Sequence, residues 1–207
     1  MQFEKGYLYH IYNQGNNQRR IFFSKPNYHY FIKKLKLYVK PYGDILAWCL
    51  MPNHFHLMVY VKTLSLNIDD TRVIKNHKTV TEVKGQKTRS FNDSIGILLR
   101  SYTRAINKQE NTSGSLFRQE TKAICINCHK GQTSNSYEVS YGRSMNVNYP
   151  PTNYPQLCFN YIHENPVKAN LVVHSTQWDY SSAQDYYGDR NGSLINKELA
   201  LEYVKLS

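Results

Sequence analysis

The chain has 207 residues, of which 41% are hydrophobic, so it can bury a core, and disorder along its whole length is excluded. Its 26 Lys and Arg against 15 Asp and Glu give a net charge of +11, which favours a polyanionic partner or an acidic membrane surface. No run approaches the ~20 apolar residues of a membrane-spanning helix, and the N-terminus lacks the apolar block of a secretory signal. We therefore expect a soluble cytoplasmic protein.

Hydrophobic periodicity predicts the elements of the first half of the chain. Residues 6–13 are aromatic and β-branched, which is typical of a strand, and residues 26–39 repeat apolar side chains at helical spacing. The apolar runs 45–50 and 55–61 flank a turn-like Met-Pro-Asn and indicate an antiparallel hairpin. Residues 62–90 contain seven Lys or Arg, three acidic residues and no clear period, so we expect a long basic loop there.

The second half adds further helices. Ser90 is the expected N-cap of a helix that extends to Ile106, with Arg100 and Arg104 on its polar side. The remaining expectations are a turn at 111–114, another strand pair or a strand extension over 116–126, a long loop at 127–153, a helix from about 155 toward Pro166, and short elements at 178–187 and 197–206.

This order of elements predicts an α+β fold. Its helices would pack on one face of an antiparallel sheet, and the other face would be free for a ligand. The sequence has no internal repeat. We therefore treat residues 1–207 as a single domain that ends in a short helical tail.

The four cysteines are too few to act as a scaffold, and a reducing cytosol would keep them as thiols, so no disulfide is expected. Cys125 and Cys128, followed by His129, match the C-x-x-C-H pattern of covalent haem attachment and also half of a zinc site. Nothing else in the sequence supports either group. Two incidental thiols at the end of a strand are the favoured interpretation.

Two histidines begin the second strand of the hairpin. Because side chains alternate along a strand, His54 and His56 share one face, about 7 Å apart, while Phe55, Leu57 and Val59 point to the core. Two imidazoles at this spacing can converge on one metal ion. The alternative is a pair of surface histidines, and two ligands alone do not make a metal site.

Tyr161 and Asn165 are four residues apart in the last predicted helix, so they share a helical face. A metal near Asn165 would be within reach of chemistry at the Tyr161 hydroxyl. The alternatives are core packing or base stacking for Tyr161, and capping of a new helical turn for Asn165, which precedes a proline. Local pattern does not decide between them. A joint site requires that the two histidines do not face the core with Phe55, and that they lie within about 10 Å of Tyr161.

These segments together resemble a known family. Residues 49–56 (CLMPNHFH) and 161–169 (YIHENPVKA), together with 9–15, 101–107 and 114–117, resemble the single-tyrosine HUH transposases, in the branch of REP-associated tyrosine transposases. The resemblance covers about residues 6–187, which we take as the core of the domain, with the expected loops 62–90 and 127–153 inside it. The ordered combination is much more specific than any one motif.

The resemblance implies a ferredoxin-like fold and an enzyme that cleaves and rejoins single-stranded DNA next to a hairpin, as in DNA transposition and recombination. It implies that His54 and His56 form the HUH motif, that Tyr161 is the nucleophile, and that Asn165 is a third metal ligand. Many relatives have Gln at that last position. Because Asn is shorter, the helix would have to approach the strand more closely.

The expected chemistry needs a cation, because a phenol with a pKa near 10 is a poor nucleophile and a phosphodiester repels anions. The ligand set favours Mg²⁺ or Mn²⁺. The expected intermediate is a 5′-phosphotyrosine, which a 3′-hydroxyl can resolve without ATP. No Gly-rich nucleotide loop is present, so no nucleotide cofactor is expected.

The expected partner is single-stranded DNA with a hairpin, and no membrane partner is expected. The candidate DNA-binding residues are polar or cationic: Asn13, Arg100, Arg104, Arg118 and Lys122. Two alternatives stay open, a non-catalytic single-stranded nucleic-acid-binding module, such as a domesticated transposase, and a metal hydrolase that uses water. Family members act as monomers or as dimers with shared active sites, so the oligomeric state and the DNA sequence recognised stay open.

Overall fold

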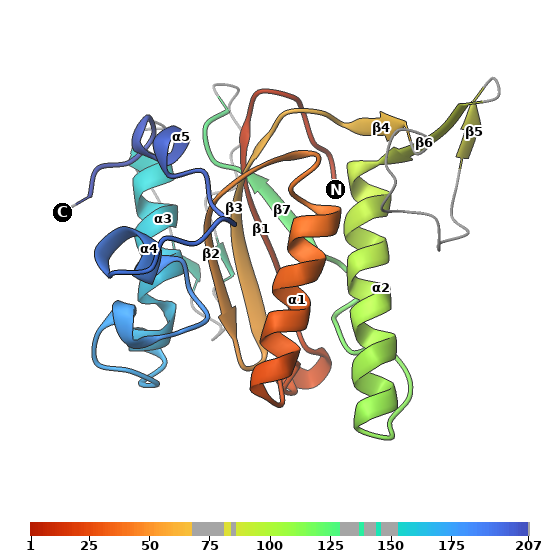
Figure 1. The fold of residues 1–207 in the computed structure, drawn as a ribbon, viewed down its shortest axis with the longest axis horizontal. Coiled ribbons are helices and arrows are strands. Elements are labelled where there is room, and N and C mark those ends of the chain that lie inside the picture. Colours follow the sequence, from red (N-terminus) through yellow and green to blue (C-terminus); the bar gives the residue numbers. More distant parts are fainter. Residues whose placement is uncertain (68–80, 84–85, 129–136, 139–143, 146–152, 207) are drawn as a thin grey trace.

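The computed structural model describes residues 1–67, 81–83, 86–128, 137–138, 144–145 and 153–206 (Figure 1). Its elements in chain order are β1 (Leu8–Gln14), η1 (Asn16–Gln18), α1 (Lys25–Tyr38), β2 (Gly43–Met51), β3 (His54–Val61), β4 (Ser65–Asn67), β5 (Thr81–Val83), β6 (Gln86–Ser90), α2 (Phe91–Gln109), β7 (Lys122–Cys125), β8 (Tyr137–Glu138), β9 (Ser144–Met145), α3 (Tyr154–Lys168), η3 (Ser175–Gln177), α4 (Ala183–Tyr187) and α5 (Lys197–Leu201). No helix among these residues is long and apolar enough to cross a membrane.

The main sheet has four antiparallel strands in the order β2-β3-β1-β7. The connectivity β1-α1-β2-β3-α2-β7 is that of a ferredoxin-like fold. The central pairing aligns Tyr12 with His56 and Gln14 with His54. The expected strand at the start of the chain, the hairpin and the antiparallel α+β fold are therefore confirmed.

The helices α1 and α2 cover one face of this sheet, as expected (Figure 1). Alternate strand residues, among them Ile11, Phe55 and Leu57, point into this layer, and Phe31 of α1 and Tyr102 of α2 fill it. The aromatic rings of Phe31 and Phe55 are 5.2 Å apart, and those of Phe31 and Tyr102 are 4.9 Å apart. Dense packing of this kind makes the layer the main hydrophobic core.

The opposite face of the sheet is not free, which corrects the prediction made from the order of elements. The helix α3 lies against it (Figure 1). There Phe159 and Ile162 pack on Leu46 and Met58. Sequence pattern contained this signal, because residues 45–50 form a continuous apolar run, and such runs are typical of strands buried on both faces. Only part of this face is apolar, and the polar part carries the candidate site.

The two expected loops are also corrected in part. Within 62–90, strands β4, β6 and β5 form a small antiparallel sheet, and residues 68–80 and 84–85 lie outside the described residues. Within 127–153, strands β8 and β9 pair, and most of the rest lies outside the described residues. Strands of two to five residues are too short to give a readable period, although Thr81, Val83 and Thr88 are β-branched residues that favour strands.

One alternative interpretation and one local prediction need correction. The helix α3 continues through Pro166 to Lys168, so Asn165 is inside the helix and does not cap a new one. Cys125 and Cys128, expected as free thiols, form a disulfide at the end of β7, where the turn brings their Cα atoms to 5.9 Å. The expected N-cap at Ser90 is confirmed, because the Ser90 hydroxyl accepts a hydrogen bond from the Asp93 backbone N–H at 3.1 Å.

Candidate functional site

The two histidines of β3 lie on the face of the sheet that α3 covers. Both side chains are only 2% exposed, so the alternative of a surface pair is wrong. Their rings are 5.0 Å apart, and the intervening Phe55 points to the opposite core, as strand alternation predicted. His54 and His56 therefore share one buried face.

The helix α3 brings the other two predicted residues to this pair. Asn165 Oδ1 lies 3.2 Å from His54 Nε2, and the Tyr161 ring lies 5.2 Å from the His56 ring. The Asn165 amide has a defined orientation, because its Nδ2 donates to the Tyr161 carbonyl oxygen at 3.3 Å. The short Asn165 side chain reaches His54, and Phe159 of the same helix packs against the sheet. The structure therefore brings together all four residues predicted for the site.

Burial sets the protonation of these groups. It lowers the pKa of His54 to about 4 and that of His56 well below its usual value, so both imidazoles are neutral near pH 7 and each has one lone pair. Burial also raises the pKa of Tyr161 to about 12, against the effect of a hydrogen bond with Asn165. The phenol is therefore protonated near pH 7. The Lys168 ammonium lies 5.6 Å from the centre of the Tyr161 ring.

The donor atoms at this site fit a small divalent cation. The His56 Nε2 atom is buried and has no hydrogen-bond partner within the described part of the chain. Two ligands at a right angle, each about 2.1 Å from one ion, are separated by about 3 Å, and His54 Nε2 and Asn165 Oδ1 are 3.2 Å apart. The described residues contain no group of three or more His, Cys, Asp and Glu that could hold a metal. A centre here would therefore depend on the Asn165 amide as its third ligand.

Three nearby residues were missed by the sequence analysis. His10 of β1 lies 2.9 Å from His56 (Nε2 to Nδ1), Asn53 lies 2.6 Å from His54 (Oδ1 to Nδ1), and Lys168 lies over Tyr161. The register between β1 and β3 decides that His10 faces the site, and a single sequence does not give that register. Asn53 directly precedes the HUH motif, so its position was the available signal.

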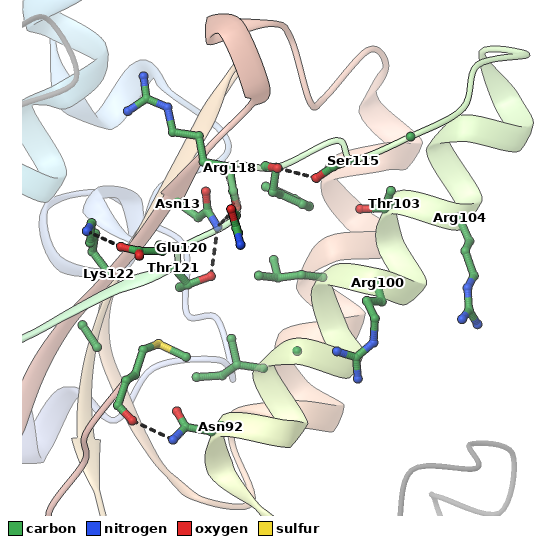
Figure 2. Close-up of a pocket in the computed structure, with 18 of the residues that line it drawn as sticks. Asn13, Asn92, Arg100, Thr103, Arg104, Ser115, Arg118, Glu120, Thr121 and Lys122 are labelled. Atoms are coloured by element: carbon green, nitrogen blue, oxygen red, sulfur yellow. Dashed lines mark hydrogen bonds and ion pairs between the residues drawn. The ribbon is translucent and has the colours of Figure 1, made fainter.

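A groove of about 910 Å³ lies beside the edge strand β7, between α2 and residues 114–123 (Figure 2). All five candidate DNA-binding residues line it: Asn13, Arg100, Arg104, Arg118 and Lys122. The last four of these residues are cationic. Glu120 is the one acidic residue among those that line the groove, and it pairs with Lys122 at 2.7 Å. Arg100 and Arg104 project from α2, and the other two cations come from the facing segment (Figure 2).

Two members of this set differ from the exposed arginines. Asn13 is 4% exposed, and its amide donates to the Arg118 carbonyl oxygen at 3.2 Å and to the Thr121 hydroxyl at 2.9 Å, so it holds the groove wall in place. Lys122 pairs with Tyr12 in the sheet register, and directly opposite residues in an antiparallel pair share a face. The Tyr12 ring is 5.7 Å from His56. Lys122 thus lines the groove and also lies on the face that carries the histidines.

Comparison with known proteins supports the fold. No protein-family model and no curated protein matches the chain. Among solved structures, one described as a REP-associated tyrosine transposase bound to a REP hairpin is similar to it, with a TM-score of 0.51 and 14% sequence identity. The similarity covers 95% of this chain and 94% of that one. At this identity, the likeness shows a shared α+β fold.

Proposed function

We propose that this protein is a metal-dependent DNA transposase or endonuclease that cleaves and rejoins single-stranded DNA near hairpins through a 5′-phosphotyrosine intermediate. One observation carries the proposal: a tyrosine and an asparagine of α3 meet two histidines of β3, with the Tyr161 ring 5.2 Å from His56 and Asn165 3.2 Å from His54. The structural neighbour, which is described as bound to a hairpin, supports the choice of DNA.

The residues His54, His56 and Asn165 would hold Mg²⁺ or Mn²⁺. The ion would supply positive charge at the scissile phosphate. The protein's own contribution is to keep the imidazoles neutral by burial and to place the phenol beside them. With a pKa of about 12, Tyr161 needs such a charge, and the neighbouring Lys168 ammonium adds to it.

The reaction balances without an external energy source. The Tyr161 oxygen forms a bond to phosphorus while the bond from phosphorus to the 3′ oxygen breaks, and the phenolic proton is lost as the leaving oxygen becomes a 3′-hydroxyl. In the second step a 3′-hydroxyl attacks the phosphotyrosine, the new phosphodiester forms, and Tyr161 recovers its proton. The number of phosphoester bonds is conserved, so no nucleotide cofactor is required.

The groove beside α2 is the proposed binding surface for the DNA backbone. Arg100 and Arg104 are exposed there and do not pair with an acid among the described residues. Lys122 lies at the edge of the sheet, on the face of the histidines. A strand that follows these cations would pass over β7 and reach Tyr161.

The test uses a single-stranded oligonucleotide that contains a hairpin, incubated with the full chain and Mg²⁺ or Mn²⁺. We expect a covalent protein–DNA band on a denaturing gel, absent from Tyr161→Phe and present in the control Tyr187→Phe, which makes the same change at an exposed tyrosine of α4. DNA binding by Tyr161→Phe should equal that of the wild type.

Other outcomes would contradict the proposal. Cleavage that persists in Tyr161→Phe would indicate a hydrolase that uses water. Binding with no cleavage under either metal would indicate a non-catalytic single-stranded nucleic-acid-binding module. An adduct that forms equally in the presence of a chelator would exclude the role of the metal.

A further inference from the structure

The two nitrogens of the His54 ring each face an amide oxygen. Nδ1 lies 2.6 Å from Asn53 Oδ1, and Nε2 lies 3.2 Å from Asn165 Oδ1. Both amides are oriented by their NH₂ groups, since Asn53 Nδ2 donates to the Gln18 carbonyl oxygen at 3.3 Å and Asn165 Nδ2 donates to that of Tyr161. His54 is therefore placed between two hydrogen-bond acceptors.

A neutral imidazole has one N–H, so it can satisfy only one of these acceptors. The contact with Asn53 is shorter by 0.6 Å, the difference between 3.2 and 2.6 Å, which favours the proton on Nδ1. The Nε2 lone pair then faces the oxygen of Asn165. Two lone pairs at this distance repel each other unless a cation lies between them.

His56 shows the same arrangement with a different partner. Its Nδ1 lies 2.9 Å from Nε2 of His10, a residue of β1 that is 4% exposed. One of these two nitrogens must donate and the other accept. If His56 donates from Nδ1, its buried Nε2, which has no partner among the described residues, is left as an unprotonated metal-binding atom.

We propose that Asn53 and His10 are positioning residues that fix the tautomers of the two histidines: each accepts a hydrogen bond from an Nδ1–H, so that both Nε2 lone pairs are directed to one site beside Tyr161. This inference rests on the metal-dependent function proposed above. It assigns each histidine of the motif its own partner, one from the turn before β3 and one from the neighbouring strand.

The consequence concerns metal affinity as well as catalysis. Partners that fix the second ring nitrogen of a ligating histidine typically contribute 10–100-fold to metal affinity. Without them, each ring can protonate Nε2 or rotate by half a turn, and the protein must reverse that change before the ion binds. Removal of either partner should therefore weaken binding even when the histidines themselves are intact.

The experiment compares substitutions that remove the acceptor with substitutions that keep one. His10→Phe and Asn53→Leu remove it, and His10→Gln and Asn53→Asp retain a side-chain oxygen. Two-bond ¹H–¹⁵N spectra of the histidine rings, recorded on the metal-free full chain, show which nitrogen carries the proton. Titration with Mn²⁺, followed by electron paramagnetic resonance, gives the metal affinity without any dependence on cleavage.

We expect both histidines of the wild type to carry the proton on Nδ1, and Mn²⁺ to bind about 10–100-fold more weakly to His10→Phe and Asn53→Leu. His10→Gln and Asn53→Asp should recover most of the affinity. An Nε2–H tautomer at His54 or His56 in the wild type, or equal affinity in all variants, would overturn the inference alone. A wild type that binds no Mn²⁺ would overturn the proposed metal centre, and the inference with it.

Discussion

The two faces of the sheet are built from alternate residues of the same strands, yet they differ in polarity. Under α1 and α2, Phe55, Leu57 and their neighbours form a continuous apolar and aromatic layer. Under α3, the apolar contacts of Met58 and Leu46 occupy one end, and buried imidazoles occupy the other. The first face stabilises the fold, and the second keeps polar atoms buried that the described residues do not satisfy. The alternation of side chains along one strand thus separates an apolar layer from the face that carries the proposed site.

The largest expected effect is on the α3 face. Replacement of His56 by Leu should reduce the rate of adduct formation by at least about 10⁴-fold, which corresponds to about 5 kcal/mol of barrier, because a ligand of the proposed metal centre is lost. The free energy of unfolding should change by only about 1 kcal/mol. The substitution removes the buried His56 Nε2, which has no hydrogen-bond partner among the described residues, and this gain offsets the loss of the hydrogen bond with His10. Single-turnover gels and urea denaturation measure the two quantities.

A chelator should have the same effect on the wild type, and added Mn²⁺ should reverse it. Substantial adduct formation by His56→Leu would show that the α3 face does not carry the proposed metal centre, and the contrast drawn between the two faces would be wrong.

The next effect belongs to the opposite face. Phe31→Ala should lower the free energy of unfolding by about 3–5 kcal/mol, because the Phe31 ring is fully buried and contacts the rings of Phe55 and Tyr102. Urea denaturation gives this value. At low temperature, the folded fraction should still form the covalent adduct at the wild-type rate. Lys33→Ala, an exposed change on the same helix, should remain within about 0.5 kcal/mol of the wild type.

A smaller effect is expected in the groove. Arg100→Ala combined with Arg104→Ala should weaken binding of single-stranded DNA by about 10-fold and lower the slope of log affinity against log salt by about 1.4. Fluorescence anisotropy at several salt concentrations measures both. The control, Lys25→Ala with Lys33→Ala, removes the same charge from exposed positions on α1. An equal loss in the control would show that net charge, and not the groove, binds the DNA.

The smallest effect concerns the cap of the helix that forms the groove. Ser90→Ala should lower the free energy of unfolding by about 1 kcal/mol, because the Asp93 backbone N–H loses its acceptor. Ser113→Ala, at an exposed position after the same helix, should have almost no effect. Thermal melts of both variants, recorded beside the wild type, provide the measurement. Equal melting temperatures for Ser90→Ala and the wild type would show that water replaces the Ser90 hydroxyl as the acceptor for the Asp93 N–H.

The part of the site that sequence could predict follows from local periodicity. Alternation along β3 placed His54 and His56 on one face, and helical spacing placed Tyr161 and Asn165 on another. Resemblance to a family then joined the two pairs, and the structure brings them within contact distance. Their catalytic roles stay predictions.

The rest depended on tertiary information. A one-residue shift in the pairing of β1 with β3 would turn His10 away from His56, and no local pattern fixes that pairing. The position of α3 on the second face, the short strands within 62–90 and the disulfide of Cys125 with Cys128 are likewise set by contacts between distant segments or by turns too short to show a period.

The placement of Tyr161 and Asn165 on one turn of α3 has a thermodynamic consequence. Because a helix turn is rigid, displacement of α3 would separate both residues from the sheet together. In the proposed centre, docking of the helix and binding of the ion are therefore linked equilibria, and each must favour the other by the same factor. A ligand or partner that displaces α3 from the histidines of β3 would therefore weaken metal binding and remove Tyr161 from the proposed site at the same time.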